Sequence, residues 1–206
     1  MDKTAAKEQL TAASTAHGEP AALVARRQAA FDHFAASRMP KMARFNFSDW
    51  DLFAKQPALT FTESTATPDL PEIKDEAIRL VQVGQSTVDV HLPKPWADQG
   101  VKLMDLFAAL DQCPDLVADQ LMAIVKPDEN KLTAYHLAYL NSGVFLYVPK
   151  GVQLDQPVEV DLVQDSTVEE REFNAHLLIV AEPGSSVSVL QHTTSVGPAA
   201  NRASLM

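Results

Sequence analysis

The sequence of 206 residues is poor in cysteine, in long apolar runs and in positive charge. Its single cysteine, Cys113, excludes an internal disulfide and any metal or cluster site built from several cysteines of one chain. No apolar run approaches the roughly 20 residues that a transmembrane helix needs, and the polar start MDKTAAKEQL lacks the apolar stretch of a secretory signal. The formal net charge of −10 argues against a nucleic-acid partner, because phosphate binding needs a cationic face. These absences predict a cytoplasmic globular protein that does not bind nucleic acid or membranes.

Sequence motifs of the common enzyme classes are also missing. The chain has no glycine-rich loop of the G-x-x-x-x-G-K-[ST] or G-x-G-x-x-G type, no H-E-x-x-H metal motif and no G-x-S-x-G nucleophile elbow. The lone Cys113 lies between Asp111 and Asp115, whose negative charges disfavour a reactive thiolate, so we interpret it as structural or incidental. The sequence therefore favours a protein that is not an enzyme.

Charge is divided unevenly along the chain. Residues 1–55 hold eight Lys and Arg against six Asp and Glu, whereas the remainder holds nine against twenty-one. A basic arm on an acidic body is suited to contact another subunit, although a solvated helix surface explains the same pattern more simply.

The first two thirds of the chain predict helices, a linker and a hairpin. Apolar positions from Leu23 to Phe34 recur at helical spacing, which predicts a helix over residues 20–37 after a frayed or disordered segment, residues 1–18. Three prolines and several Ser and Thr mark residues 54–75 as a linker. The expected elements that follow are a hairpin of residues 78–83 and 86–91 and helices near residues 101–112, 115–124 and 132–139.

The last third of the chain reads as strands separated by turns. The run Val144–Val148 is β-branched, aromatic or Leu throughout, and Val158, Val160 and Leu162 alternate with polar residues. The expected strands are residues 144–148, 158–163, 175–181 and 186–191. Since no helix separates these strands, we expect them to be adjacent and turn-linked in a stacked or sandwiched all-β region.

Two of the six histidines are candidates for a metal or cluster site. His176 and His192 lie on consecutive predicted strands, but nothing near them in sequence supplies a third ligand. Ordinary strand histidines, on the surface or hydrogen-bonded in the core, explain both more simply.

Two further segments have alternative interpretations. Trp50 and three phenylalanines, Phe45, Phe47 and Phe53, form an aromatic cluster that is either a partner-binding hot spot or, as we favour, the contact that fixes the N-terminal helix to the body. The charged segment Glu169–Glu172 is predicted to be a solvated loop.

Four short segments follow one another in the second half of the chain, namely Leu140–Gly143, Val148–Val152, Gln156–Val158 and Leu178–Ser185. Their succession resembles the SufB/SufD family of iron–sulfur cluster assembly scaffolds. Residues 26–40 are similar to the N-terminal helix of the SufD branch. The resemblance covers most of residues 20–195.

The resemblance implies an α+β fold with N-terminal helices and a small α/β region, followed by the first turns of a β-helix-like all-β region. It divides the chain into a helical arm (1–55), a linker (56–75), an α/β region (76–141) and the start of a β-helix core (142–206). The family's cluster ligands and ATPase-docking helices lie beyond residue 206. No catalytic, cofactor-binding or metal-binding residue of the family therefore maps onto these positions.

The function implied by the resemblance is that of a SufD-like scaffold subunit, not an enzyme, which works with SufB-like and SufC-like subunits. The iron–sulfur cluster belongs to the full assembly, and we expect none bound by these residues alone. The rival hypothesis is a metal-dependent β-helix or cupin-like enzyme that uses His176 and His192 on a carbohydrate or a small molecule. Because a β-helix cut after a few turns exposes strand edges, we also expect self-association through a free β edge.

Overall fold

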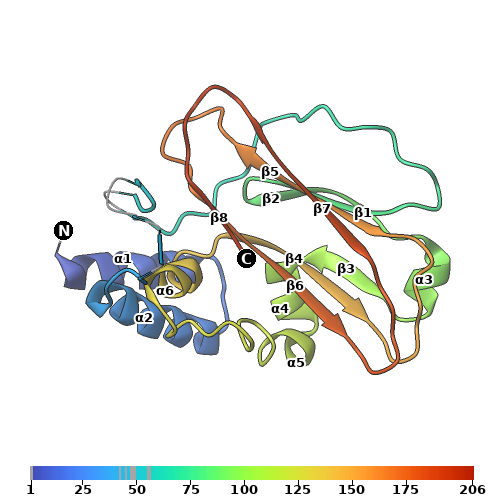
Figure 1. The fold of residues 1–206 in the computed structure, drawn as a ribbon, viewed down its shortest axis with the longest axis horizontal. Coiled ribbons are helices and arrows are strands. Elements are labelled where there is room, and N and C mark those ends of the chain that lie inside the picture. Colours follow the sequence, from blue (N-terminus) through green and yellow to red (C-terminus); the bar gives the residue numbers. More distant parts are fainter. Residues whose placement is uncertain (1, 42, 45, 47–49, 55–56) are drawn as a thin grey trace.

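The computed structural model describes residues 2–206 with the exception of residues 42, 45, 47–49 and 55–56. It has two stacked β-sheets, and helices cover the outer face of one of them (Figure 1). The helices are α1 (Lys3–Ala16), α2 (Ala21–Ala36), α3 (Lys94–Asp98), α4 (Leu106–Gln112), α5 (Pro114–Val117) and α6 (Lys131–Ala138). The strands are β1 (Ile78–Val83), β2 (Ser86–His91), β3 (Lys102–Asp105), β4 (Ser142–Val148), β5 (Val158–Asp165), β6 (Phe173–Ala181), β7 (Val189–Val196) and β8 (Ala203–Leu205). The predicted α+β class is confirmed.

The N-terminal arm is a pair of helices. The prediction for α2 is confirmed, whereas the residues before it form the regular helix α1 instead of a frayed or disordered segment. The side chain of Asp2 accepts a hydrogen bond from the backbone N–H of Thr4 and so caps α1. Leu10 is buried in the same core as Leu23 of α2, so tertiary packing stabilises a helix whose composition alone is weak.

The middle of the chain confirms the hairpin but corrects two helices. β1 and β2 pair antiparallel around Gly84, whose φ of 53° suits a tight turn. The first half of the helix predicted over residues 101–112 is instead β3, which pairs antiparallel with β4 and buries Leu103 between the sheets. A partner strand some 40 residues away in sequence decides this, and helical spacing cannot reveal it.

The helix predicted over residues 115–124 ends at Val117. The guanidinium of Arg26 donates hydrogen bonds to the carbonyl oxygens of Ala118 and Leu121, and the backbone of Met122 is left-handed at φ 54°. These contacts hold the segment as successive turns. The next helix, α6, lies where it was predicted and begins with a capping box formed by Asn130 and Thr133.

The β region has a regular alternation between two sheets. Sheet 1 has the order β2-β1-β5-β7 and sheet 2 the order β3-β4-β6-β8. From β4 to β8, consecutive strands lie in opposite sheets, and strands two apart pair in parallel. The strands are therefore linked by turns, as predicted, but consecutive strands are not neighbours in one sheet. The fourth predicted strand is displaced: it forms residues 189–196 instead of 186–191.

The two sheets share one apolar core. The alternation predicted for β5 is confirmed, since Val158, Val160 and Leu162 all point into this core. The other strand residues that are buried there are Ile78, Leu80, Leu103, Val144, Leu146, Val148, Phe173 and Ala175. A second core, built from the helices together with Phe145 and Leu178, lies on the outer face of sheet 2.

The segment before β1, which was predicted to be a linker, has no helix or strand in its described residues. It is held against the body, because Ala66 and Leu70 cover Val81, Val83 and Val163 on the outer face of sheet 1. Figure 1 shows it as the teal segment that passes along that sheet.

Candidate functional site

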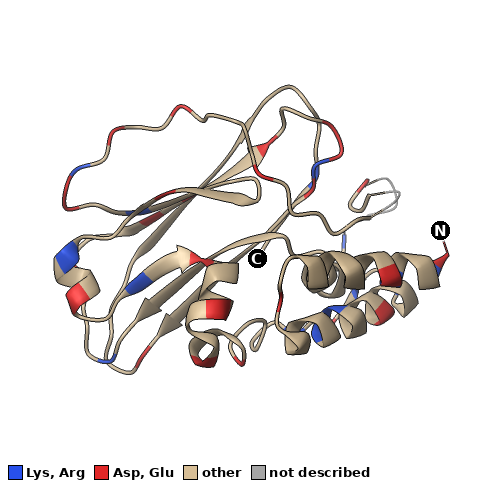
Figure 2. Ribbon diagram, turned by 180° about the vertical axis from the view of Figure 1, so that it is seen from behind, with Lys and Arg blue, Asp and Glu red and all other residues tan. Residues whose placement is uncertain are grey.

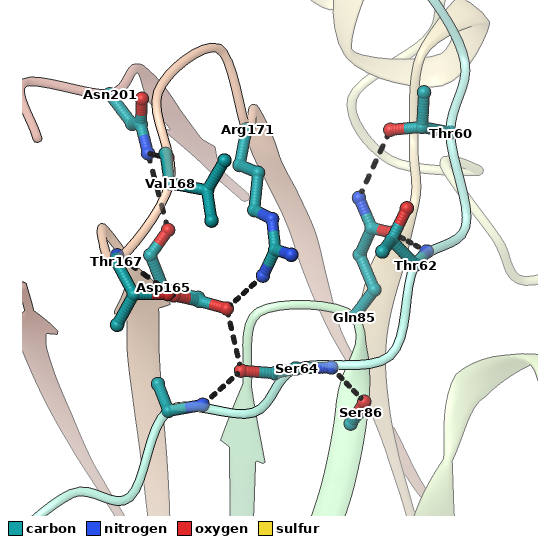
Figure 3. Close-up of polar contacts among 11 residues, drawn as sticks. Thr60, Thr62, Ser64, Gln85, Ser86, Asp165, Thr167, Val168, Arg171 and Asn201 are labelled. Atoms are coloured by element: carbon teal, nitrogen blue, oxygen red, sulfur yellow. Dashed lines mark hydrogen bonds and ion pairs between the residues drawn. The ribbon is translucent and has the colours of Figure 1, made fainter.

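The densest polar cluster surrounds Asp165, at the C-terminal end of β5 (Figure 3). One carboxylate oxygen accepts hydrogen bonds from the backbone N–H of Thr167 at 3.0 Å and from its hydroxyl at 2.5 Å. The other oxygen accepts from the Ser64 hydroxyl at 2.8 Å and forms an ion pair with Arg171. Asp165 is 3% exposed, so four donors, one of them the cationic Arg171, enclose a nearly buried carboxylate.

These contacts make Asp165 a structural acceptor. Burial alone would raise the pKa of its carboxyl, but the hydrogen bonds from Thr167 and Ser64 and the charge of Arg171 outweigh burial and lower the pKa. A carboxylate that stays ionised and already accepts from four donors is a poor general acid or base. The cluster therefore holds segments together and is not suited to proton transfer.

Three segments distant in sequence meet at this cluster, which we call the Asp165 junction. The linker enters through Ser64, whose backbone N–H also donates to the hydroxyl of Ser86 at 2.9 Å. The connection between β7 and β8 enters through Asn201, whose amide donates to the carbonyl oxygen of Asp165 at 3.2 Å. The turn after β5 supplies Thr167 and Arg171. Figure 3 shows Ser64, Thr167 and Arg171 at the carboxylate of Asp165 and Asn201 at the backbone carbonyl of the same residue.

A second polar cluster is buried between α6 and sheet 2. Nδ1 of His176 lies 3.3 Å from Nε2 of His136, and Nδ1 of His136 lies 3.0 Å from the hydroxyl of Ser204 in β8. Burial, with smaller contributions from His176 and Arg27, lowers the pKa of His136 to about 3. Burial also lowers the pKa of His176 to about 4. Both imidazoles are neutral near pH 7, which allows one ring N–H to donate to the other ring.

The structure does not bring the two candidate histidines together. His176 lies in sheet 2 and is 7% exposed, whereas His192 lies in sheet 1 with an exposed side chain. The partner of His176 is His136, which the sequence did not suggest because the two are 40 residues apart and lie on different kinds of element. No group of three or more His, Cys, Asp or Glu within the described part of the chain is arranged to hold a metal ion.

Cys113 and the aromatic residues have structural surroundings. Cys113 links α4 to α5, packs against the helical core and is partly exposed. Phe53 packs against Phe34 of α2 and Tyr135 of α6, with ring centroids 5.2 and 4.8 Å apart, which agrees with a role in fixing the N-terminal helix. Phe45 and Phe47 lie outside the described residues, and Trp50 is 54% exposed.

Several positive charges of the arm are engaged within the chain. Arg27 is buried, pairs with Glu19 at 2.6 Å and donates to the carbonyl oxygens of Leu137 and Ala138 at the end of α6. Lys7 pairs with Asp32 at 2.6 Å, so both signs of charge occur side by side on these helices (Figure 2). These contacts favour the simpler interpretation of the arm over a basic docking surface.

The charged segment before β6 was predicted to be a solvated loop, but only part of it is exposed to solvent. Glu169 and Glu170 are exposed, but Arg171 belongs to the Asp165 junction. Glu172 accepts a hydrogen bond from the hydroxyl of Tyr135 at 2.5 Å. Half of this loop thus ties sheet 2 to the helices and to the junction.

Among the described residues, no helix is both long enough and apolar enough to span a bilayer.

Comparison with known proteins adds evidence from a different source. Residues 8–160 match the family model described as the SufBD protein N-terminal region. The chain is 36% identical over 199 residues to the iron-sulfur cluster assembly protein SufD of Bacillus subtilis, a match that covers 92% of this chain and 45% of that protein. It is 29% identical over 140 residues to an iron-sulfur cluster assembly SufBD family protein of Pyrococcus horikoshii, covering 61% of this chain and 31% of the relative. An Arabidopsis thaliana member of the same family is 23% identical over 221 residues, covering 95% of this chain and 47% of the relative. The chain thus spans less than half the length of these relatives.

Proposed function

Since this chain belongs to the SufB/SufD family, on its SufD branch, we propose that it forms the N-terminal part of a scaffold subunit for iron–sulfur cluster assembly. The observation that carries the proposal is the match to the family's N-terminal region over residues 8–160. The identity to SufD supports it, because that match extends over nearly the whole chain. In this role the protein holds other subunits in place and performs no reaction of its own.

The topology supports a second element of the proposal, that the stacked sheets are the first turns of a β-helix. In such a fold each turn crosses between sheets and pairs in parallel with the turn before it. The register here is continuous along β5 and β7, and along β4 and β6, with no shift in either ladder. The domain division that we propose follows from this: an arm (1–55), a linker (56–75), an α/β region (76–141) and the start of the β-helix core (142–206).

The partners that we propose are SufB-like and SufC-like subunits in the cytoplasm. The cluster is the cargo of the whole assembly, and the ATPase activity belongs to the SufC-like subunit. No residue described above is assigned to the cluster, because the Asp165 junction is saturated with internal donors and the histidine pair is buried.

The rival hypothesis, a metal-dependent enzyme, required His176 and His192 in one site. Their separation into different sheets removes the two ligands on which that hypothesis depended. The family match favours the scaffold role independently of this geometry.

A chimera tests the proposal. This chain replaces the matching N-terminal 45% of Bacillus subtilis SufD, and the chimera is expressed in cells depleted of their own SufD. We expect it to copurify with the SufB and SufC subunits and to restore the activity of cluster-dependent enzymes.

The matched control is the same chimera with Gly143→Asp. A Cβ at this position would lie 2.6 Å from the backbone oxygen of His176, so β4 and β6 cannot pair normally. A chimera that is folded and abundant, yet neither binds the partners nor restores activity, would contradict the proposed function.

A further inference from the structure

The run of turns between α5 and α6 presents two large apolar side chains to solvent (Figure 1). Ile124 is 93% exposed and Val125 is 38% exposed, whereas Leu121 and Met122 just before them are buried. We call Ile124 and Val125 the apolar tip. Single apolar residues are ordinary on a protein surface, but adjacent ones form a patch that calls for an explanation.

The apolar tip is held in place by contacts on both of its sides. Before the tip, Arg26 of α2 donates hydrogen bonds to two backbone carbonyl oxygens, and the buried Met122 anchors the chain in the helical core. After the tip, the hydroxyl of Thr133 donates to the carbonyl oxygen of Pro127 at 3.3 Å. Because the segment is fixed on both sides, its own chain keeps the tip exposed.

An apolar groove lies beside the tip, between α2 and the segment that carries the tip. Its cavity volume is about 400 Å³. Ala29 and Ala30 of α2, Met122 and Leu137 of α6 supply its apolar lining, and neither residue of the apolar tip lines it. An apolar cavity of about 150 Å³ is enough to bind benzene, so the groove has room for both side chains of a tip.

We propose that this patch is a self-complementary contact, in which the apolar tip of each copy enters the groove of a second copy of this chain. The tip and the groove adjoin on one surface, and a twofold contact brings the same surface of two copies face to face. A single contact therefore buries both tips and fills both grooves. This inference goes beyond the proposed scaffold function and does not rest on it.

The chemistry of the contact is mainly apolar. Arg26 and Lys126 line the groove together with a single carboxylate, so acidic groups do not crowd it although the chain has a net charge of −10. Two copies repel each other at long range, and salt screens that repulsion. Dimerisation should therefore strengthen as the salt concentration rises, whereas a contact made of surface ion pairs would weaken.

Neither the tip nor the groove is part of the β region. Both are formed by α2, α6 and the segment between α5 and α6, within the residues that match the family's N-terminal region. Further turns of the proposed β-helix would pair with β7 and β8, and these strands contribute no residue to the groove. The patch is therefore compatible with a longer β-helix.

Analytical ultracentrifugation of the 206-residue chain tests the contact, in a concentration series up to about 1 mM, where even a weak dimer is populated. Ile124→Ser removes a side chain that the dimer buries twice, so it should weaken dimerisation at least about 100-fold. Ile124→Leu should dimerise like the wild type. Val168→Ser, at a position that is 50% exposed in another loop, is the matched control and should leave dimerisation unchanged. Circular dichroism checks that each variant is folded.

Two further experiments test the groove. Ala29→Arg, at an exposed helix position, should preserve the fold but fill the groove, and so weaken dimerisation at least about 10-fold. In a Cys113→Ser background, chains with Ile124→Cys should be joined to chains with Ala29→Cys by a short thiol-reactive cross-linker. Chains with Lys150→Cys, at an exposed turn, should not be joined to them. The same cross-link should form between full-length chimeras with Bacillus subtilis SufD.

A wild-type chain that stays monomeric at every concentration and salt condition overturns the inference. So does a dimer that Ile124→Ser does not weaken, because its contact would then lie elsewhere, for example at a strand edge. A cross-link that forms between the 206-residue chains but not between folded chimeras also overturns it, because the rest of the subunit would then cover the groove. None of these results alters the scaffold function, which partner binding and restored enzyme activity test separately.

Discussion

Acidification should destabilise this protein through its buried histidine pair. Burial lowers the pKa of His136 to about 3 and that of His176 to about 4, against an ordinary value of 6.5 in the unfolded chain. At pH 5 the folded protein still holds both imidazoles neutral, while the unfolded chain binds a proton on each. A group with a lower pKa in the folded state stabilises the fold above its unfolded pKa and loses that contribution as pH falls below it.

The expected loss follows from the size of this window. Each histidine that must stay neutral lowers the free energy of unfolding by about 1.4 kcal/mol for each pH unit below its unfolded pKa. On going from pH 7 to pH 5, about 1.5 pH units lie below the unfolded pKa of 6.5. Each histidine should therefore lower the free energy of unfolding by about 2 kcal/mol, and the pair by about 4 kcal/mol. Domains are typically stable by about 5–15 kcal/mol, so the change is easily measured.

Urea denaturation at pH 7 and pH 5, followed by circular dichroism, measures this loss. The double variant His136→Gln with His176→Gln should be less stable at pH 7 but should lose about 3–4 kcal/mol less than the wild type on acidification. His17, whose pKa burial also lowers, is present in both proteins, so the difference between them isolates the pair. His192→Gln, at an exposed position, serves as the control and should keep the full loss. Equal losses in the wild type and the double variant would refute the reasoning.

Three further substitutions probe contacts that join distant segments, each measured by urea denaturation. Arg27→Met leaves Glu19 buried without its partner and should lower the free energy of unfolding by about 3–5 kcal/mol. Adding Glu19→Gln should recover part of this loss. If the losses of the two single substitutions simply add in the double variant, the two residues are not coupled. Asp165→Asn should lower the free energy of unfolding by about 1–3 kcal/mol and speed hydrogen exchange in residues 62–66. The surface variant Asp128→Asn should change neither quantity. Unchanged exchange in Asp165→Asn would show that the linker is held by other contacts. Gly197 has a φ of 110°, and an added Cβ there would lie 2.3 Å from a backbone carbon of Ser166, so Gly197→Ala should lower the midpoint of denaturation. Gly18→Ala, where an added Cβ has open space around it, should lower the midpoint less.

The sequence by itself determined the elements whose signals are local. The helix α2 and the hairpin β1–β2 follow from spacing and from turn residues that lie within a dozen positions of one another. The strand β5 follows from its strict alternation, which needs only one buried face to be read correctly. The resemblance to the SufB/SufD family also came from short segments of sequence, and the family match confirmed it.

Tertiary structure decided the features that depend on partners far along the chain. Residues 102–105 form β3 because β4 offers an antiparallel edge, and Arg26 holds the turns that follow α5 by binding the carbonyl oxygens of Ala118 and Leu121. The pairing of His136 with His176, instead of His176 with His192, depends on which sheet receives each strand. Alternation tells which side chains of a strand share a face, but it does not tell whether the next strand joins the same sheet or crosses to the other. That choice is made by long-range hydrogen bonding and by burial between layers, and neither leaves a signal at short range in the sequence.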